Sequence, residues 1–183
     1  MIKSGGMMAN FMVAVIGKDK PGIIAGISKV IYENGMNIED GSSTILAGEF
    51  STILVVSGNI SQNDLRESFK GVSEALDLYV AIHQIEGART VKGNNEHALI
   101  TVYAADRPGI LYGVSTPLAK YGINIIDLDT RVVGSEDNPA YIASFEVELP
   151  KDYTFDMLEK LMAKIKTEQN LNISAKQLNG TAL

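Results

Sequence analysis

The sequence predicts an α+β fold built from two consecutive copies of one β-α-β-β-α-β unit, each an antiparallel sheet with its helices on one face. Two observations carry this prediction: the chain repeats itself after 87 residues, and strand-like and helix-like patterns follow in the same order in both copies. Residues 19–23 return as residues 106–110, and residues 11–40 share 11 of 30 positions with residues 98–127. A period this long indicates a duplicated small domain, because solenoid repeats run about 20–50 residues.

The first copy opens with a strand and a helix. Residues 11–16 form a short apolar run, which is typical of a buried strand. We expect Asp19 to be the N-cap of the following helix and Pro21 to lie in its first turn, where its missing N–H has no consequence. Gly35 is the expected end of this helix, because a C-terminal glycine readily takes a left-handed conformation.

A hairpin, a second helix and a last strand complete the first copy. The expected hairpin strands are Ile38–Leu46 and Phe50–Ser57, and the last strand is Leu78–Ile85. Ser61 is the expected N-cap of the second helix, with Asp64 three residues on. This helix is predicted by apolar residues at helical spacing, namely Leu65, Phe69, Val72 and Leu76.

The second copy repeats this order with two departures. Pro117 falls inside its first helix, where it should kink or loosen the helix. The hairpin loop is predicted to be longer, over residues 134–139. The order β-α-β-β-α-β is the ferredoxin-like layout. We therefore expect a first domain over residues 8–87, a linker over 88–96 and a second domain over 97–183.

Composition excludes several classes of function. The net charge is −6 with a sequence pI of about 4.9, and the 16 basic residues form no cluster, so direct nucleic-acid binding is not expected. The chain has no cysteine, which excludes disulfides and thiolate metal sites. No apolar run approaches the ~20 residues of a membrane helix. These features are compatible with a cytoplasmic protein.

The turn between the first strand and the first helix of each copy is the candidate ligand site. Helix N-termini present unpaired N–H groups with partial positive charge, which suits a carboxylate. Gly22 and Gly109 let a ligand approach the backbone. Positive and negative side chains recur beside the turn, as a zwitterion requires: Lys20 and Arg107, Asp19 and Asp106, Asp40 and Asp127.

Simpler interpretations remain for each of these residues. Asp19 and Asp106 can be helix caps alone, and Lys20 and Arg107 can be solvated surface charges. Asn37 and Asn124, which follow the helix-ending glycine, can donate to a ligand or simply satisfy a turn. Gly26 and Gly113, inside the helices, indicate close packing rather than ligand contact.

The motif Asp-(Lys/Arg)-Pro-Gly-Ile, followed by a helix and then by Gly-x-Asn-Ile, resembles the ACT domain, a ferredoxin-like regulatory module. The resemblance covers both copies. Two such domains in tandem resemble the glycine-cleavage-system transcriptional repressor group, and the first copy also resembles the N-terminal domain of formyltetrahydrofolate deformylase. The resemblance implies the following ligand contacts: Asp19, Lys20, Pro21, Gly22, Ile23 and Asn37, with Asp106, Arg107, Pro108, Gly109, Ile110 and Asn124.

The resemblance further implies a non-enzymatic regulatory protein that binds an amino acid or similar small ligand at interfaces between paired domains. It would act through contact with a transcription factor or an enzyme, as a homo-oligomer, without a cofactor, metal or nucleic acid. One alternative is a trans-acting regulatory subunit of an amino-acid enzyme. Another is an acylphosphatase-like hydrolase, which the same topology allows.

No catalytic constellation supports the hydrolase. The only histidines, His83 and His97, have no counterparts in the other copy. Ser28 and Ser115 lie inside predicted helices without a neighbouring base, which a serine nucleophile needs. RNA-recognition domains share the topology but stack bases on exposed strand aromatics, whereas the aromatics of 141–149 alternate like a core face.

Overall fold

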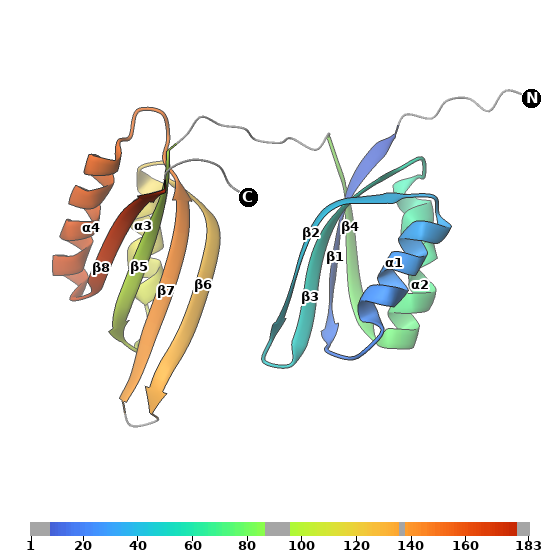
Figure 1. The fold of residues 1–183 in the computed structure, drawn as a ribbon, viewed down its shortest axis with the longest axis horizontal. Coiled ribbons are helices and arrows are strands. Elements are labelled where there is room, and N and C mark those ends of the chain that lie inside the picture. Colours follow the sequence, from blue (N-terminus) through green and yellow to red (C-terminus); the bar gives the residue numbers. More distant parts are fainter. Residues whose placement is uncertain (1–7, 87–95, 136–137, 179–183) are drawn as a thin grey trace, which may run out of the picture. The chain divides into compact units, whose positions relative to one another are not determined.

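The computed structural model describes residues 8–86, 96–135 and 138–178. The chain divides into two compact units, residues 1–91 and residues 92–183, which we call unit 1 and unit 2 and describe separately. Over the described residues the fold comprises eight strands and four helices in the order β-α-β-β-α-β, twice, which confirms the predicted class (Figure 1). The expected linker, 88–96, lies outside the described residues except for Glu96.

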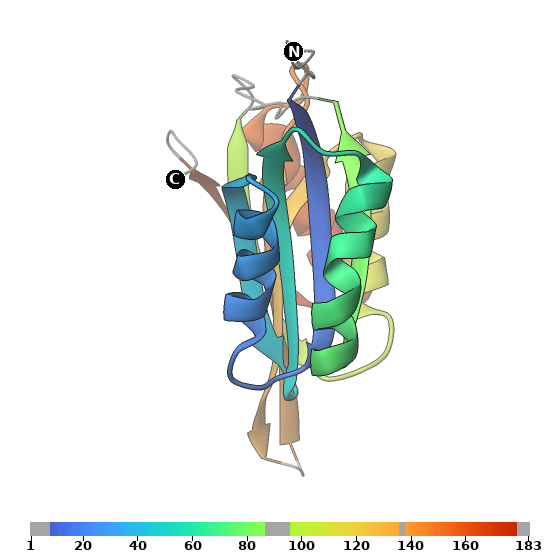
Figure 2. The same cartoon turned by 90° about the vertical axis from the view of Figure 1, so that its right-hand side faces the viewer.

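Unit 1 is a four-stranded antiparallel sheet of order β2-β3-β1-β4. Both of its helices lie on one face of the sheet, with α1 towards β2 and α2 towards β4 (Figure 2). A β-bulge between Ile38 and Asp40 shifts the β2 register. The elements of unit 1 are β1 (Ala9–Lys18), α1 (Ile23–Glu33), β2 (Asn37–Leu46), β3 (Glu49–Gly58), α2 (Gln62–Leu76) and β4 (Leu78–Ile85).

Unit 2 repeats this sheet with the order β6-β7-β5-β8 and a bulge at the matching place, between Ile125 and Asp127. Its elements are β5 (His97–Ala105), α3 (Ile110–Lys120), β6 (Asn124–Ser135), β7 (Asn138–Glu148), α4 (Phe155–Gln169) and β8 (Asn172–Leu178). The hairpin differs from the prediction of a loop over 134–139. Gly134 pairs with Pro139 and Ser135 with Asn138, so the strands continue to residues 135 and 138.

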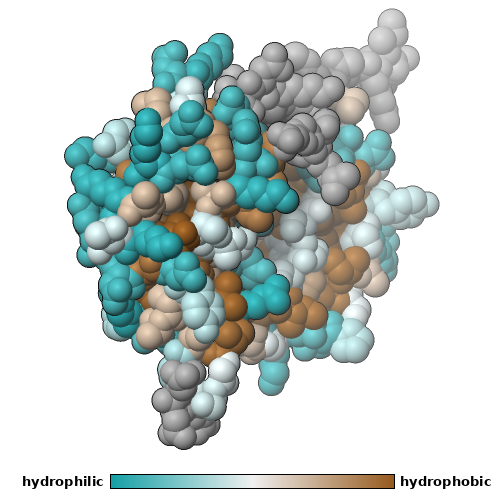
Figure 3. Space-filling view, turned by 60° about the vertical axis from the view of Figure 1, so that its left-hand side comes forward, coloured by the Kyte–Doolittle hydropathy of each residue, from teal (hydrophilic) through white to brown (hydrophobic). Residues whose placement is uncertain are grey.

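Each unit has its own hydrophobic core between the sheet and its helices. In β1, Phe11, Val13 and Val15 are fully buried while the residues between them face away from the helices. In unit 2, buried and more exposed residues alternate along β7, as the sequence predicts, and β5 alternates in the same way. Hydrophobic side chains outside the cores also reach the surface in patches (Figure 3); those that bear on function are analysed below.

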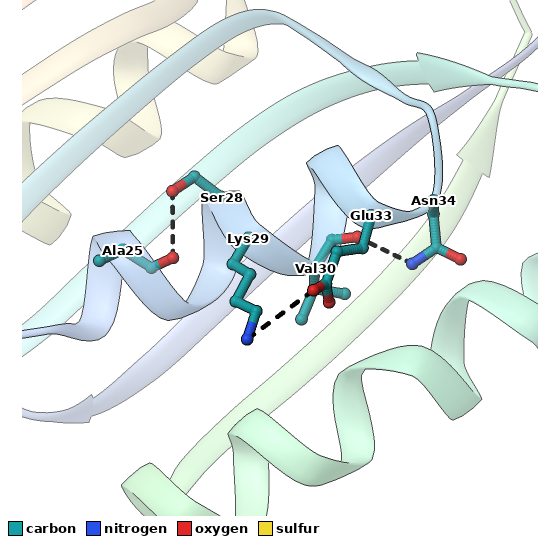
Figure 4. Close-up of polar contacts among 6 residues, drawn as sticks. All are labelled: Ala25, Ser28, Lys29, Val30, Glu33 and Asn34. Carbon is teal, nitrogen blue, oxygen red and sulfur yellow. Dashed lines mark hydrogen bonds and ion pairs between the residues drawn. The ribbon is translucent and has the colours of Figure 1, made fainter.

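The helix ends follow the sequence in most places. Ser61 caps α2 by accepting from the backbone N–H of Asp64 at 3.1 Å, as predicted. At the end of α1, the Asn34 side chain donates to the Val30 carbonyl at 2.8 Å (Figure 4), and Gly35 follows with a φ of 63°. Helix α3 continues through Pro117 from Ile110 to Lys120.

The two edges of the unit 1 sheet are finished differently. At the β4 edge, Gln62 and Arg66 of α2 both donate to the Ile82 carbonyl, at 2.9 and 3.1 Å, and Ser73 donates to the Leu78 carbonyl at 2.7 Å. These side chains occupy acceptors that an added strand would need. Strand β2, at the other edge, is exposed along its whole length. Unit 1 is therefore open to lateral contact at β2 and protected at β4.

Candidate ligand-binding turns

The predicted turn of unit 1 joins β1 to α1. The backbone N–H of Asp19 donates to the Gly48 carbonyl at 3.0 Å, which ties the turn to the β2–β3 hairpin. Gly22 then takes a left-handed conformation, with a φ of 99°, and α1 begins at Ile23. No side chain caps this helix start, and its first turn carries no acidic residue. The first N–H groups of α1 are therefore available to an anion at the positive end of the helix dipole.

Unit 2 builds the same turn. The Asp106 N–H donates to the Pro139 carbonyl at 3.2 Å, Gly109 has a φ of 92°, and α3 begins at Ile110 without a side-chain cap. The predictions that Asp19 caps the helix and that Pro21 lies in its first turn are therefore wrong, because Pro21 precedes the N-cap. The left-handed glycine takes the N-cap position, so the aspartate lies three residues before it and remains exposed.

The residues of the turn divide into anchors and accessible groups. Ile23 and Ile110 are buried in the cores, at 2% and 3% exposure, so their side chains hold the turn and only their backbone N–H groups can reach a ligand. Pro21 and Pro108 are exposed. At Gly22 and Gly109 an added Cβ would meet nothing within 4 Å. Space above the turn is open in both units, and the backbone conformation alone selects glycine there.

The cations of the two turns are placed differently. Arg107 donates from Nη2 to the Gln169 carbonyl at 2.6 Å, so it caps the C-terminal end of α4. Lys20 makes no hydrogen bond or ion pair with any described residue. The Gln169 side chain also packs over α3, because a Cβ at Gly113 would lie 3.0 Å from its Oε1. The Arg107–Gln169 contact joins residues 62 positions apart, and no local pattern predicts it.

Asn37 and Asn124 lie away from the turns of their own units. Each begins the strand that follows the first helix, and each is exposed. Helix α1 has 11 residues and is therefore about 16 Å long, so Asn37 and Gly22 lie at its opposite ends. The same holds for α3, Gly109 and Asn124. A single unit does not bring the two parts of the predicted site together.

The aspartates Asp40 and Asp127 accompany the asparagines rather than the turns. Asp40 follows the bulge of β2 and accepts from the Gly41 N–H at 2.7 Å, and Asp127 follows the bulge of β6. Both side chains are exposed. Each unit thus presents a donor-rich turn at one end of its first helix and an amide with a carboxylate at the other end.

A lateral surface connects these two ends in unit 1. Large apolar side chains of α1 and β2 are exposed there: Ile24, Tyr32, Ile38 and Ile45. In unit 2, β6 exposes Leu128 and Val132 on the corresponding side of its strand. An apolar surface beside an unprotected sheet edge is typical of a contact between proteins.

Histidine and acidic side chains are the groups from which a metal or acid–base site is built. No group of three or more His, Asp or Glu side chains in 8–86, 96–135 and 138–178 is arranged to hold a metal ion. His97 Nδ1 lies 3.3 Å from Glu146 Oε1, while His83 is exposed on β4. In the same part of the chain no helix is long and apolar enough to cross a membrane.

A cavity of about 210 Å³ opens in unit 1 between α2 and β4, and no residue of the unit 1 turn lines it. It is lined by Arg66, Phe69, Lys70, Ser73, Val80 and Ile82. Arg66 and Ser73 already donate to carbonyls of β4, so the polar part of this lining serves the sheet edge. The cavity is not part of the candidate site.

Comparison with known proteins places both units in one family. The ACT domain family matches residues 10–83 and, separately, residues 98–163. A UPF0237 protein of Methanopyrus kandleri is 38% identical over 90 residues, which cover 43% of this chain and 100% of that protein. A UPF0237 protein of Streptococcus mutans is 40% identical over 73 residues, covering 39% of this chain and 83% of that protein.

Two solved structures share the fold of nearly the whole chain. A structure described as an unknown protein from Galdieria sulphuraria has a TM-score of 0.77 at 23% identity, covering 93% of this chain and 99% of the other. A proposed glycine cleavage system transcriptional repressor has a TM-score of 0.75 at 15% identity, covering 96% of this chain and 100% of the other. At these identities the likeness concerns the fold.

Proposed function

The chain belongs to the ACT domain family, and we propose that it is a non-enzymatic regulatory protein that binds an amino acid at an interface between paired ACT domains. The observation that carries the proposal is the turn at Gly22, repeated at Gly109. In each, a left-handed glycine starts a helix that no side chain caps, beneath open space. Such a helix start binds a carboxylate through backbone N–H groups.

The opposite ends of α1 explain why the site lies between domains. An amino acid is only a few ångströms long, so it cannot bridge the roughly 16 Å that separates Gly22 from Asn37 in one domain. Two domains paired through α1 and β2 in antiparallel orientation bring the turn of one beside the Asn37 end of the other. The carboxylate then binds at the turn, and Asn37 with Asp40 accepts the ammonium group of the ligand.

Regulation follows from this position. A ligand held by two domains favours the arrangement in which both contribute, and it shifts the equilibrium only by its difference in affinity between the arrangements. We propose that the preferred arrangement is recognised by a partner protein in the cytoplasm. The fold shared with a proposed glycine cleavage system transcriptional repressor supports a transcriptional regulator of amino-acid metabolism as that partner. Direct DNA binding is disfavoured by the net charge of −6.

A thermal-shift screen of the purified protein against the common amino acids tests the proposal. A ligand that binds only the native state at a hundred times its Kd raises stability by about 2.7 kcal/mol. We expect a selective rise with one chemical class of amino acid. Absence of a shift with every amino acid would contradict amino-acid sensing.

The site is tested by paired charge removals. We expect Lys20→Ala with Arg107→Ala to weaken the shift, because both cations flank a turn. Lys29→Ala is the control for loss of positive charge: it removes one cation from α1, where Lys29 pairs with Glu33 at 3.7 Å and both side chains are exposed. An unchanged shift in the double variant would exclude these cations from the site. Co-purification with an enzyme rather than a transcription factor would favour a regulatory subunit instead.

A further inference from the structure

The face of the unit 1 sheet that carries no helix is unusually apolar, and we call it the open face. An antiparallel sheet covered on one side normally places polar residues on the other. Here Ile16 and Ile53 are half exposed, at 50% and 51%, and Tyr79 is exposed at 71%. The residues of the central part of the open face, strand by strand, are Asp40, Ser42 and Thr44 on β2; Ser51, Ile53 and Val55 on β3; Met12, Ala14 and Ile16 on β1; and Tyr79, Ala81 and His83 on β4.

The strand registers order these residues in three rows across the sheet. The central row places Ile53 beside Ala14, and Ala14 beside Ala81, with Ser42 at the β2 edge. The rows on either side carry larger side chains, with Met12 in one and Ile16 in the other. The open face is therefore low at its centre and raised on both sides, with the single large side chain of its central row on β3.

We propose that the open face of unit 1 docks onto the open face of a second copy of this chain. The two-fold axis lies midway between the two facing sheets. It is perpendicular to the strands and runs along the central row of residues. This operation places Ile53 against Ile53 and Met12 against Ile16 of the other copy. Face-to-face sheets whose strands lie roughly aligned are an ordinary packing mode, with about 10 Å between the sheets. The proposal does not depend on amino-acid binding.

The charges in the central rows of the open face allow it to pair with itself. The same operation places Asp40 over Thr44, and His83 over Tyr79. Charged side chains towards the ends of the strands also meet neutral ones, with Lys18 over Asn10. Glu49 comes over Ser57, which donates to Glu39, so two acidic side chains approach each other at the rim, beside Lys18. In the three central rows no like charges meet, so desolvation of the apolar centre is not opposed by repulsion.

The open face is also large enough to form a stable interface between two copies of the chain. Four strands spaced about 4.8 Å apart and about 30 Å long make a face roughly 19 Å wide. Its flat area of about 570 Å² becomes larger once side-chain relief is included, which is of the order of the roughly 800 Å² that each partner contributes to a standard interface. The exposed side chains of Ile53 and Ile16 lie on the two central strands, where a stable interface has its apolar centre.

The corresponding face of unit 2 lacks these properties and provides the matched control. Its central row is polar, with Asp129 on β6, Ser144 on β7 and Thr101 on β5. The same two-fold operation would place Asp129 against Asp129. We therefore assign the contact to unit 1 alone.

The test uses the identity of the residues that meet at the axis. Ile53→Lys and Ile53→Glu each place like charges against one another, so each should have half the native mass of the wild type in sedimentation velocity and light scattering. Mixing the two variants pairs Lys with Glu and should restore the wild-type mass. Ser144→Lys, at the matching position of unit 2, should leave the mass unchanged. Thermal unfolding and circular dichroism verify that every variant is folded.

Three outcomes would overturn the proposal. Ile53→Lys could keep the wild-type mass, or the mixture could fail to recover it. Alternatively, the variants could lose a different co-purifying protein at unchanged mass, which would make that protein the occupant of the open face. Failure of the amino-acid proposal would appear separately, as an absent thermal shift in wild-type protein, and would leave the mass measurements unaffected.

Discussion

The two units have the same fold position by position, but the residues on their surfaces make different contacts. The matching turns start their helices with Gly22 and Gly109 in the same left-handed conformation. Beside these turns, Arg107 is bound to the end of α4 whereas Lys20 is left without a partner among the described residues. Ile53 of one open face corresponds to Ser144 of the other. The backbone of the turn is thus common to both units, and contacts made at the surface distinguish them.

The sheet edges show the same divergence. Counted from the N-caps Ser61 and Thr154, the α4 residues that match Gln62 and Arg66 are Phe155 and Glu159. Neither can donate a hydrogen bond from its side chain at neutral pH. In the described part of unit 2, accordingly, no α4 side chain donates to a carbonyl of β8. Protection of the sheet edge by helix side chains is therefore a property of unit 1 that the described part of unit 2 does not share.

Substitutions in the cores should have the largest effect and should show whether the units are energetically separate. Phe69→Ala removes a side chain that is 1% exposed, and we expect it to destabilise unit 1 by about 3–5 kcal/mol. Met162 occupies the matching position of α4 and is 3% exposed, so Met162→Ala should destabilise unit 2 by about 2–5 kcal/mol. Hydrogen exchange with mass spectrometry locates each loss.

We expect each core substitution to reduce protection in its own unit only, because each unit has its own core. An equal loss of protection across both units after Phe69→Ala would show that they unfold as one cooperative block, and the comparison between separate units would then fail.

The helix-starting glycines should have the next largest effect, equal in the two units. Gly22→Ala and Gly109→Ala each force a Cβ into a left-handed backbone, at a cost of about 1–2 kcal/mol. Gly71→Ala is the control, because Gly71 lies inside α2 with free space around its Cβ position and should gain about 1 kcal/mol. Denaturation midpoints measure both changes. We expect the stability change to be negative for Gly22→Ala and Gly109→Ala and positive for Gly71→Ala. A Gly22→Ala variant with unchanged stability would show that the turn can relax.

Local patterns predicted those parts of the fold that local chemistry decides. The Ser61 cap, the helix ends at Gly35 and Gly122 and the alternation of β7 each depend on residues within a few positions of one another. The N-cap of α1 was misassigned because Asp19 and Gly22 both satisfy a cap rule, and the φ of 99° at Gly22 decides between them. The loop over 134–139 was overestimated because Pro139 can end a strand pairing or stand within one.

The candidate site was predictable only in part, for two physical reasons. Contacts such as Arg107 with Gln169 depend on how α4 returns to the turn, which periodicity does not encode. The separation of Asn37 from Gly22, by contrast, follows from the length of the helix between them and could have been derived from the sequence. The sequence pattern identified the groups of the site, but the structure shows that one domain does not join them.

Removal of the turn cations should have a smaller effect that differs between the units. Arg107→Ala removes a positive charge hydrogen-bonded at the C-terminal end of α4, and we expect a loss of about 0.3–1 kcal/mol. Lys20→Ala should leave stability unchanged. Arg107→Lys, which retains the charge but lacks the planar donor group, should be intermediate. Urea denaturation is sufficient to rank the three. Equal losses from Lys20→Ala and Arg107→Ala would contradict the different placement of the two cations.

The smallest expected effect is a pH dependence confined to unit 2. Arg131 Nη2 donates to Asp129 Oδ2 at 2.8 Å, and this hydrogen bond holds the Asp129 pKa below its ordinary value of 3.8. Since the folded-state pKa is lowered, the contribution to stability is present above the unfolded-state pKa and disappears as the pH falls through the folded-state value. Ser42 and Thr44 occupy the matching positions of β2, so unit 1 has no equivalent pair. Carboxyl NMR titration should show a lower midpoint for Asp129 in the wild type than in Arg131→Ala, whereas an identical midpoint would mean that solvent screens this exposed pair completely.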